Sequence, residues 1–367
     1  MTKIKEFKPI AFINADGGTG RAAKIVRETI FEEFPTVDIP MTVEERIRTN
    51  DNCIKEAVEA LRKCGTGFKN STASDHPKIK ELGWKSANIL MRPEVGAFGI
   101  LRILQGPGRY KDICGVLRYA YGGFYDEKSC DIQIIKGRRV AVSTQHMDLD
   151  GLRPFAILAN EIAKRQNLHI ILSSKSTIAE TQRLFRTEIE KVWEEFGLTR
   201  GEAYNKKGEI WTGNFHHELS DVLLAGLPIV TADGTPFANG KFLHVADNEV
   251  GDISTDIIDW QHGNRVMGSR VYCENPDGSQ FIYEELPGGT ADKMTTGEMI
   301  GDNFLNPIGI IFAMAASFEK VNPEQSEFFN EVRKYALNYI KIVPKKAERD
   351  TEKMINMIRE KTCHLIK

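Results

Sequence analysis

A repeated alternation of short apolar runs and amphipathic helices is the feature that most constrains the fold of this chain. The run KPIAFIN (8–14) predicts a buried strand, DGGTGR (16–21) a tight turn, and AAKIVRETIFEEF (22–34) a helix with one apolar face. The same rhythm returns in mid-chain as a helix, a strand and a second helix over 155–166, 169–175 and 177–197. Alternating strands and helices predict an α/β fold.

The chain is long enough for more than one compact domain. At 367 residues it exceeds the size at which one core usually keeps growing, so we expect two domains, or one large α/β domain with a smaller one embedded in it. From Asn306 to Lys361 the periodicity is helical, with breaks at Pro323 and Pro344. We expect these helices to cover the sheet.

The charge balance and the cysteine spacing exclude several classes of protein. With 49 basic and 51 acidic side chains the formal net charge is -2, so no overall field favours nucleic acid or an anionic membrane. No apolar run approaches a membrane span and the first residues do not resemble a secretory leader, so we expect a cytoplasmic location. The six cysteines form no CxxC pair, which favours free thiols over a disulfide framework or a zinc site.

Two carboxylates stand four residues apart where a helix is predicted to follow the strand FLHVAD. In GDISTDIIDW, Asp252 and Asp256 would project from one face of that helix. Mg²⁺ and Mn²⁺ are bound by a few carboxylates together with water and substrate oxygens, which such a pair allows. The alternative is a pair of acids that only stabilise the start of the helix.

Further polar side chains fall at the ends of apolar segments. Lys175 directly follows the strand HIILSS, where it would serve as a base or remain a solvated lysine. Arg118 and Tyr125 flank a Gly-Gly turn and offer a fixed cation and a phenol, or belong to an aromatic-rich hairpin. In KSANILMRPEVGAFGILR the donor-rich side chains suit a ligand with several carboxylates, although surface arginines are common; they are Ser86, Asn88, Arg92 and Arg102.

Taken in order, these residues resemble the motifs of the isocitrate and isopropylmalate dehydrogenases, the β-decarboxylating dehydrogenases. The resemblance extends over nearly the whole chain. The matching motifs are Ser-x-Asn-x-x-x-Arg with an Arg ten residues on (Ser86, Asn88, Arg92, Arg102), Arg with Tyr seven positions later (Arg118, Tyr125), a strand-end Lys (Lys175) and Asn-x-x-Gly-Asp-x-x-x-Asp (Asn248, Gly251, Asp252, Asp256).

The resemblance implies an isocitrate dehydrogenase-like fold. A large cofactor-side α/β domain of residues 1–95 and 258–367 would hold a smaller inserted domain of residues 96–257, which carries the dimer interface. It also implies an active site in the cleft, with the serine and asparagine on one substrate carboxylate, the three arginines on the others, Lys175 as base and Tyr125 as acid. Members of the family place the lysine that Lys175 resembles, and one carboxylate, in the active site of the partner subunit. We therefore expect an obligate homodimer with composite active sites.

The cofactor loop departs from the family pattern. In YEELPGGTADKM, Gly288 stands where the family has His and Asp292 where it has Pro, so NAD⁺ and NADP⁺ both remain open. Lys293 resembles the lysine that NADP-using members place on the 2'-phosphate, whereas Asp292, with a one-residue gap, resembles the acid of NAD-using members. The expected cofactor-binding residues are Thr72, Gly289, Thr290, Ala291, Asp292, Lys293 and Asn306.

A third metal carboxylate is expected from the partner subunit. In FHHELSDVLLAGLP, Glu218 lies nearest to the family's position, with His217 and Asp221 as alternatives. A zinc site of His216, His217 and Glu218 is disfavoured because we expect these residues on a helix, where consecutive side chains point about 100° apart. The following segment, IVTADGTPFANGKF, looks like an insertion relative to the family.

The expected reaction is metal-dependent oxidation of isocitrate, or a close 2-hydroxy tricarboxylate, by NAD⁺ or NADP⁺ with loss of CO₂ to give 2-oxoglutarate. Mg²⁺ or Mn²⁺, held by Asp252, Asp256 and Glu218, would activate the substrate hydroxyl. One alternative is the same chemistry on homoisocitrate, 3-isopropylmalate or a phosphonate analogue. The other is a non-catalytic regulatory or ligand-binding subunit, which the missing loop histidine favours and the retained Tyr125 and Lys175 disfavour.

Overall fold

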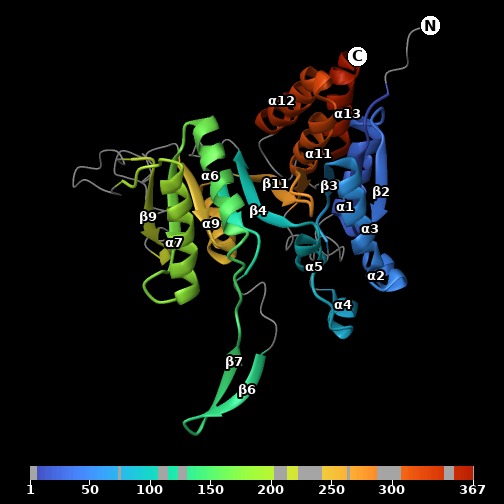
Figure 1. Cartoon of the computed structure of the whole chain (residues 1–367). Coiled ribbons are helices and arrows are strands. Elements are labelled where there is room, and N and C mark those ends of the chain that lie inside the picture. The colour runs from blue at the N-terminus through green and yellow to red at the C-terminus, as the bar shows by residue number, and fades with distance from the viewer. Residues whose placement is uncertain are drawn as a thin grey trace. The chain divides into compact units, whose positions relative to one another are not determined.

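The chain divides into two compact units in the computed structural model (Figure 1). The terminal unit comprises residues 1–96 and 267–367, and the central unit comprises residues 97–266. The structure describes residues 6–72, 76–105, 115–122, 130–201, 213–221, 242–262, 265–286, 307–342 and 351–366. Each unit is an α/β layer structure, so the mixed α/β prediction is confirmed.

The terminal unit is built on strands in the order β2-β1-β3-β12-β11. Strands β1, β2, β3 and β12 are parallel, and β11 runs antiparallel to β12. The strands are β1 (Ile10–Asn14), β2 (Thr36–Pro40), β3 (Gly67–Lys69), β11 (Arg265–Glu274) and β12 (Gln280–Glu285). The helices of the first part are α1 (Gly17–Ile30), α2 (Val43–Thr49), α3 (Asn52–Cys64), α4 (Pro77–Glu81) and α5 (Ala87–Glu94).

The C-terminal helices pack with α1 over a core rich in phenylalanine. Phe31, Phe34, Phe318 and Phe328 have ring centroids 5.2–6.2 Å apart and are nearly or fully buried. The elements are α11 (Ile308–Val321), the 3-10 turn η3 (Pro323–Gln325), α12 (Ser326–Ile342), α13 (Thr351–Thr362) and the turn η5 (Cys363–Leu365). The helical prediction for this end of the chain, with its break at Pro323, is therefore confirmed in the described residues.

The central unit has its own strands in the order β4-β5-β10-β8-β9. Strands β5, β10, β8 and β9 are parallel, and β4 is antiparallel to β5. The elements are β4 (Ala97–Gln105), β5 (Gly115–Tyr119), α6 (Leu152–Gln166), β8 (His169–Ser174), α7 (Glu180–Glu195), β9 (Phe215–Leu219), β10 (Phe242–Ala246) and α9 (Asn248–His262). Helices α6 and α7 are tied together by the Trp193 indole, which donates to the Ala156 carbonyl at 2.8 Å.

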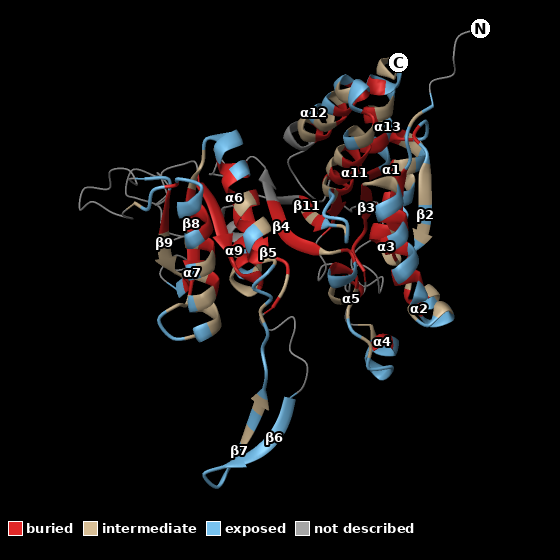
Figure 2. Cartoon of the chain, in the orientation of Figure 1, coloured by how far each residue is buried: buried red, intermediate tan, exposed pale blue. Residues whose placement is uncertain are grey.

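A separate antiparallel hairpin belongs to the central unit. Among the described strands, β6 (Cys130–Ile135) and β7 (Arg138–Ser143) pair with each other alone, and β6 is exposed along its whole length (Figure 2). Ile132 and Ile134 are 65% and 69% exposed. A two-stranded hairpin alone is marginally stable in water, and isoleucines add apolar area that a partner would cover.

Two local predictions need correction. The segment 16–21 was expected to be a turn, but α1 already begins at Gly17, with Asp16 as its extended N-cap. The segment FHHEL was expected to be helical, but it forms strand β9. Of the cysteines, Cys114 lies outside the described residues and the other five are free thiols, as expected. No helix among the described residues combines the length and the apolar character needed to cross a membrane.

Candidate active site

Two buried arginines and one carboxylate meet in the central unit. Arg118 at the end of β5 and Arg102 on β4 both reach Asp252 on α9, with nitrogen–oxygen distances of 2.5 and 3.1 Å. The arginine side chains are 2% and 6% exposed, whereas that of Asp252 is 32% exposed. Two buried cations therefore converge on one carboxylate that still faces solvent, an arrangement that suits an anionic ligand beside a cation site.

The first turn of α9 is shaped to bring Asp252 to the arginines. Gly251 lies against β5 so closely that a Cβ atom built there would stand 2.3 Å from the Arg118 Cβ. Asp247 precedes the helix and accepts the Val250 N–H at 2.8 Å, which is N-cap geometry. The Asn248 amide donates to the Ala120 carbonyl at 3.3 Å and fastens the same turn to the end of β5.

The Asp252 and Asp256 carboxylates form the core of a candidate metal site. Both lie on α9 one turn apart, and Asp256 is exposed. Within the described segments no three His, Cys, Asp or Glu side chains gather closely enough to hold a metal by themselves. Two carboxylates on one helix face fit Mg²⁺ or Mn²⁺, which complete their shell with water and substrate oxygens, and do not fit a closed zinc cage.

Lys175 stands directly after β8, as expected, and its partner is Asp221. The Lys175 ammonium lies 2.6 Å from the Asp221 carboxylate, and their side chains are 35% and 59% exposed. Asp221 follows β9, the parallel neighbour of β8, so strand pairing brings the two residues to the same edge. At this partly open strand end, the Lys175 amine can exchange a proton with a bound substrate. The Asp221 carboxylate beside it can contribute an oxygen atom to a metal ion.

The other candidates on β9 are engaged differently. The Glu218 carboxylate accepts the backbone N–H of Leu219 at 3.0 Å. His217 bonds to the Ser174 hydroxyl at 2.8 Å, and burial, with Arg186 and Arg200 nearby, lowers its pKa to about 3. Because β9 is a strand, His216 and His217 point to opposite faces, so the two imidazoles do not converge with Glu218 on one ion.

Helix α5 carries the candidate substrate residues of the terminal unit. Ser86 caps this helix and accepts the Asn88 N–H at 3.3 Å, and Asn88 and Arg92 follow one turn apart on the same face. Among the described residues, the Asn88 Oδ1 atom is buried with no hydrogen-bond partner. A buried polar atom without a partner is costly, so its position indicates a place where a ligand or water completes the hydrogen bonds.

The ends of β3 and β12 add buried groups next to α5. Arg92 lies 2.6 Å from Glu285, the last residue of β12, and Glu285 is the register partner of Lys69 at the end of β3. Lys69 is fully buried, and this burial is the main cause that lowers its pKa to about 8. The charge of Glu285 raises the pKa, whereas those of Arg92 and Arg46 lower it. The expected cofactor residue Thr72 follows three positions later and is 1% exposed.

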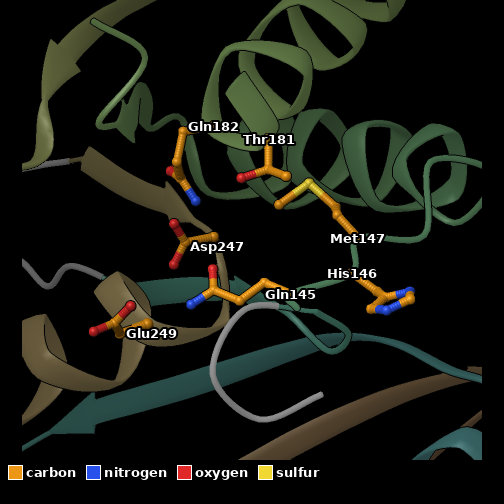
Figure 3. A pocket seen from close by; sticks show the side chains of 7 residues that line it. All are labelled: Gln145, His146, Met147, Thr181, Gln182, Asp247 and Glu249. Carbon is orange, nitrogen blue, oxygen red and sulfur yellow. The ribbon is translucent and has the colours of Figure 1, made fainter. Parts of the chain in front are cut away.

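A small polar pocket lies in the central unit at the N-terminal ends of α7 and α9. Its volume is about 30 Å³, room for roughly one water molecule. Figure 3 shows the Asp247 carboxylate facing the Gln182 amide, with Glu249 and Gln145 nearby. Burial raises the pKa of Asp247, and burial followed by the Asp247 charge raises that of Glu249. The Asp247 side of the pocket is occupied by the cap of α9.

The sequence model of the isocitrate/isopropylmalate dehydrogenases matches residues 24–327, most of the chain. The chain belongs to this family.

The chain is similar at low sequence identity to several isocitrate dehydrogenases. An isocitrate dehydrogenase named for NADP from Saccharomyces cerevisiae is 23% identical over 352 residues, which span 85% of this chain and 80% of that protein. A protein of the same name from Sphingobium yanoikuyae is 22% identical over 353 residues, 85% of this chain and 82% of that one. The crystal structure of isocitrate dehydrogenase from Ostreococcus tauri in complex with isocitrate and magnesium(II) has a TM-score of 0.75 at 19% identity, covering 96% and 99% of the two chains, and so shares the fold.

The structure brings some of the predicted site residues together, and others lie outside the residues that it describes. Arg102, Arg118 and Asp252 meet in the central unit, while Ser86, Asn88 and Arg92 share α5 in the terminal unit. Several predicted residues lie outside the described segments: Tyr125, Gly288, Gly289, Thr290, Ala291, Asp292, Lys293 and Asn306. Most of the insertion IVTADGTPFANGKF also lies outside them.

Three buried ionisable residues near the site were missed in the sequence. Lys69, Asp247 and Glu285 each end, or directly follow, an apolar strand, which is the same signal that singled out Lys175. Glu285 is hard to recognise in the sequence because Glu284 stands next to it, and two adjacent glutamates suggest a solvated turn. Only strand pairing reveals that one glutamate faces Lys69 and Arg92 while the other faces Arg270.

Proposed function

We propose that this chain oxidises and decarboxylates isocitrate, or a close 2-hydroxy tricarboxylate, to 2-oxoglutarate and CO₂ with reduction of NAD⁺ or NADP⁺. The observation that carries the proposal is the meeting of Arg102 and Arg118 on Asp252. Guanidinium groups bind carboxylates bidentately, and a carboxylate held between them sits where a divalent cation and a polycarboxylate would be bound together. In the terminal unit, Asn88 and Arg92 on α5 are groups of the kind that bind carboxylates.

Asp252 and Asp256 would hold Mg²⁺ or Mn²⁺. A bound divalent cation supplies Lewis-acid polarisation of the substrate hydroxyl and the neighbouring carboxylate. For the third carboxylate we favour Asp221 over Glu218, because Asp221 reaches Lys175 whereas Glu218 accepts its own neighbouring backbone N–H. On this proposal both Lys175 and Asp221 act in the site of the partner subunit.

The ion pairs of Asp252 suggest how the ligands bind. Arg102 and Arg118 both pair with Asp252, so a cation bound by Asp252 would compete with two buried guanidinium groups. Substrate carboxylates would take over these guanidinium groups and release Asp252. The substrate and the cation should therefore bind more tightly together than singly.

Proton transfer is assigned to Lys175 and Tyr125. Lys175, as a neutral amine, would remove the proton of the substrate hydroxyl, and Asp221 beside it would stabilise the ammonium that forms. The nicotinamide cofactor, when bound, would supply the hydride acceptor. After CO₂ departs, Tyr125 would protonate the enol. The buried arginines Arg102 and Arg118 remain on the other carboxylates and orient the substrate throughout.

The nicotinamide cofactor is assigned to the terminal unit through Thr72, Gly289, Thr290, Ala291, Asp292, Lys293 and Asn306. The NADP-named relatives favour NADP⁺, and Lys293 agrees with that choice, while Asp292 leaves NAD⁺ as the alternative.

We propose that the chain forms a homodimer. The exposed β6-β7 hairpin supports it, because Ile132 and Ile134 carry apolar area that pairing with a second copy would bury. A dimer would also allow Lys175 of one subunit to complete the site of the other.

The test is an activity panel on purified protein with Mg²⁺ or Mn²⁺ and each nicotinamide cofactor, against isocitrate, homoisocitrate and 3-isopropylmalate. We expect isocitrate to be turned over and Lys175→Met to reduce kcat by at least a hundredfold. Lys191→Met, an exposed lysine on α7, is the matched control and should retain activity. Turnover of another substrate alone would correct the substrate, and isocitrate binding without any reduced cofactor would favour a non-catalytic subunit.

A further inference from the structure

Glu285 lies in a buried group of charges of which the proposed function uses only Arg92. It ends β12, is 1% exposed, and stands beside the fully buried Lys69 of the parallel strand β3. Its carboxylate is 2.6 Å from the Arg92 guanidinium, which is also buried. Three elements that are distant in sequence, β3, α5 and β12, therefore contribute one charged side chain each to the same interior location.

Lys69 adds positive charge beside the pair of Arg92 and Glu285. The charge of Glu285 raises the pKa of Lys69 and that of Arg92 lowers it, so the three groups lie within electrostatic reach of one another. The nearby Arg46 guanidinium is paired with Asp51 at 2.7 and 3.0 Å. Two buried cations beside the Glu285 carboxylate favour the binding of an anionic ligand.

Helix α5 connects this group to the candidate substrate residues. Arg92 and Asn88 lie one turn apart on the same face, and the Asn88 Oδ1 atom is buried without a partner among the described residues. A long arginine side chain loses rotamer freedom when it binds a ligand. An ion pair that already holds the guanidinium removes part of that cost and fixes the direction of its donors.

We propose that Glu285 is a positioning residue, which holds the Arg92 guanidinium in the orientation that binds a substrate carboxylate. The inference rests on the proposed function in one respect, that Arg92 contacts the substrate. Glu285 itself need not touch the ligand.

The neighbouring residue provides a matched control. Glu284 lies on the same strand, is 4% exposed, and pairs with Arg270 at 2.6 Å, but its side chain faces the opposite side of the sheet. Glu284→Gln and Glu285→Gln each remove one buried carboxylate charge from an ion pair with an arginine, Arg270 in one case and Arg92 in the other. The two variants should lose similar stability, so a difference between them in ligand binding reports on position and not on folding.

The experiment measures binding of isocitrate and citrate by calorimetry in the presence of Mg²⁺ and without nicotinamide cofactor. Citrate is a tertiary alcohol and cannot undergo the oxidation, so its binding is independent of turnover. We expect Glu285→Gln to weaken binding of both ligands at least tenfold and Glu284→Gln to change it less than twofold. In steady-state assays Glu285→Gln should raise KM at least tenfold and change kcat less than threefold.

A double-variant cycle tests whether Glu285 acts through Arg92. In an Arg92→Gln background, adding Glu285→Gln should change binding less than twofold. Unchanged binding in Glu285→Gln, equal weakening in Glu284→Gln, or a full further loss in the double variant would overturn the inference while leaving the proposed function intact. Conversely, wild-type protein that binds isocitrate but reduces neither cofactor would defeat the proposed function, and the citrate titrations would still decide the role of Glu285.

Discussion

Replacing Lys69 with methionine should stabilise the protein at neutral pH. Lys69 is fully buried, and burial lowers its pKa from 10.5 to about 8, with Arg92 and Arg46 also lowering it and Glu285 opposing them. The difference corresponds to about 3 kcal/mol of unfavourable free energy for the charged form in the fold. Methionine has a similar length and no charge, so Lys69→Met should recover an amount of this order.

The stabilisation should depend on pH with a defined sign. Between pH 8 and 10.5 the folded chain has lost the Lys69 proton while the unfolded chain still holds it, so the stability of the wild type rises with pH in this window. The advantage of Lys69→Met is therefore full below about pH 8 and declines toward pH 10.5. For a unit of this size, about 3 kcal/mol corresponds to a rise in Tm of roughly 6–12 °C.

Differential scanning calorimetry at pH 7 and pH 10 checks both parts. Lys55→Met, an exposed lysine on α3, is the control and should shift Tm little at either pH. A Lys69→Met variant that is less stable than the wild type at pH 7, or whose gain is as large at pH 10, would show that the buried ammonium is well compensated and refute the reasoning.

Three further predictions concern the central unit. Gly251→Ala should destabilise it by about 1–3 kcal/mol in urea unfolding, because the added Cβ meets that of Arg118 at 2.3 Å; an unchanged midpoint would mean that α9 shifts freely. Asp252→Asn should weaken Mn²⁺ binding in the presence of isocitrate at least tenfold by paramagnetic resonance, and unaltered affinity would remove Asp252 from the metal site. Ser173→Ala should reduce stability by about 1–3 kcal/mol, because it removes the 2.6 Å hydrogen bond to the fully buried His244, whose Nδ1 has no partner among the described residues. An unchanged unfolding temperature would contradict this.

Local sequence signals anticipated many elements of the fold because their causes are local. Apolar runs and helical periodicity placed β1, β8 and α7, and the strand FLHVAD with the helix after it placed Asp252 and Asp256 on one helix face. The error at FHHEL has a physical cause: a five-residue segment with two histidines has no periodicity that distinguishes a strand from a helix, and its pairing with β8 decides the matter.

The sequence by itself determined the α/β class, the family motifs and the chemical types of the candidate site residues, since these depend on residue identity and short-range spacing. Only the tertiary structure decided their partners. It joined Asp252 to Arg102 and Arg118, Lys175 to Asp221, and Arg92 to Glu285. Each pair joins residues on different strands or helices, many positions apart, so the contact depends on which strands are neighbours and on which face each side chain points.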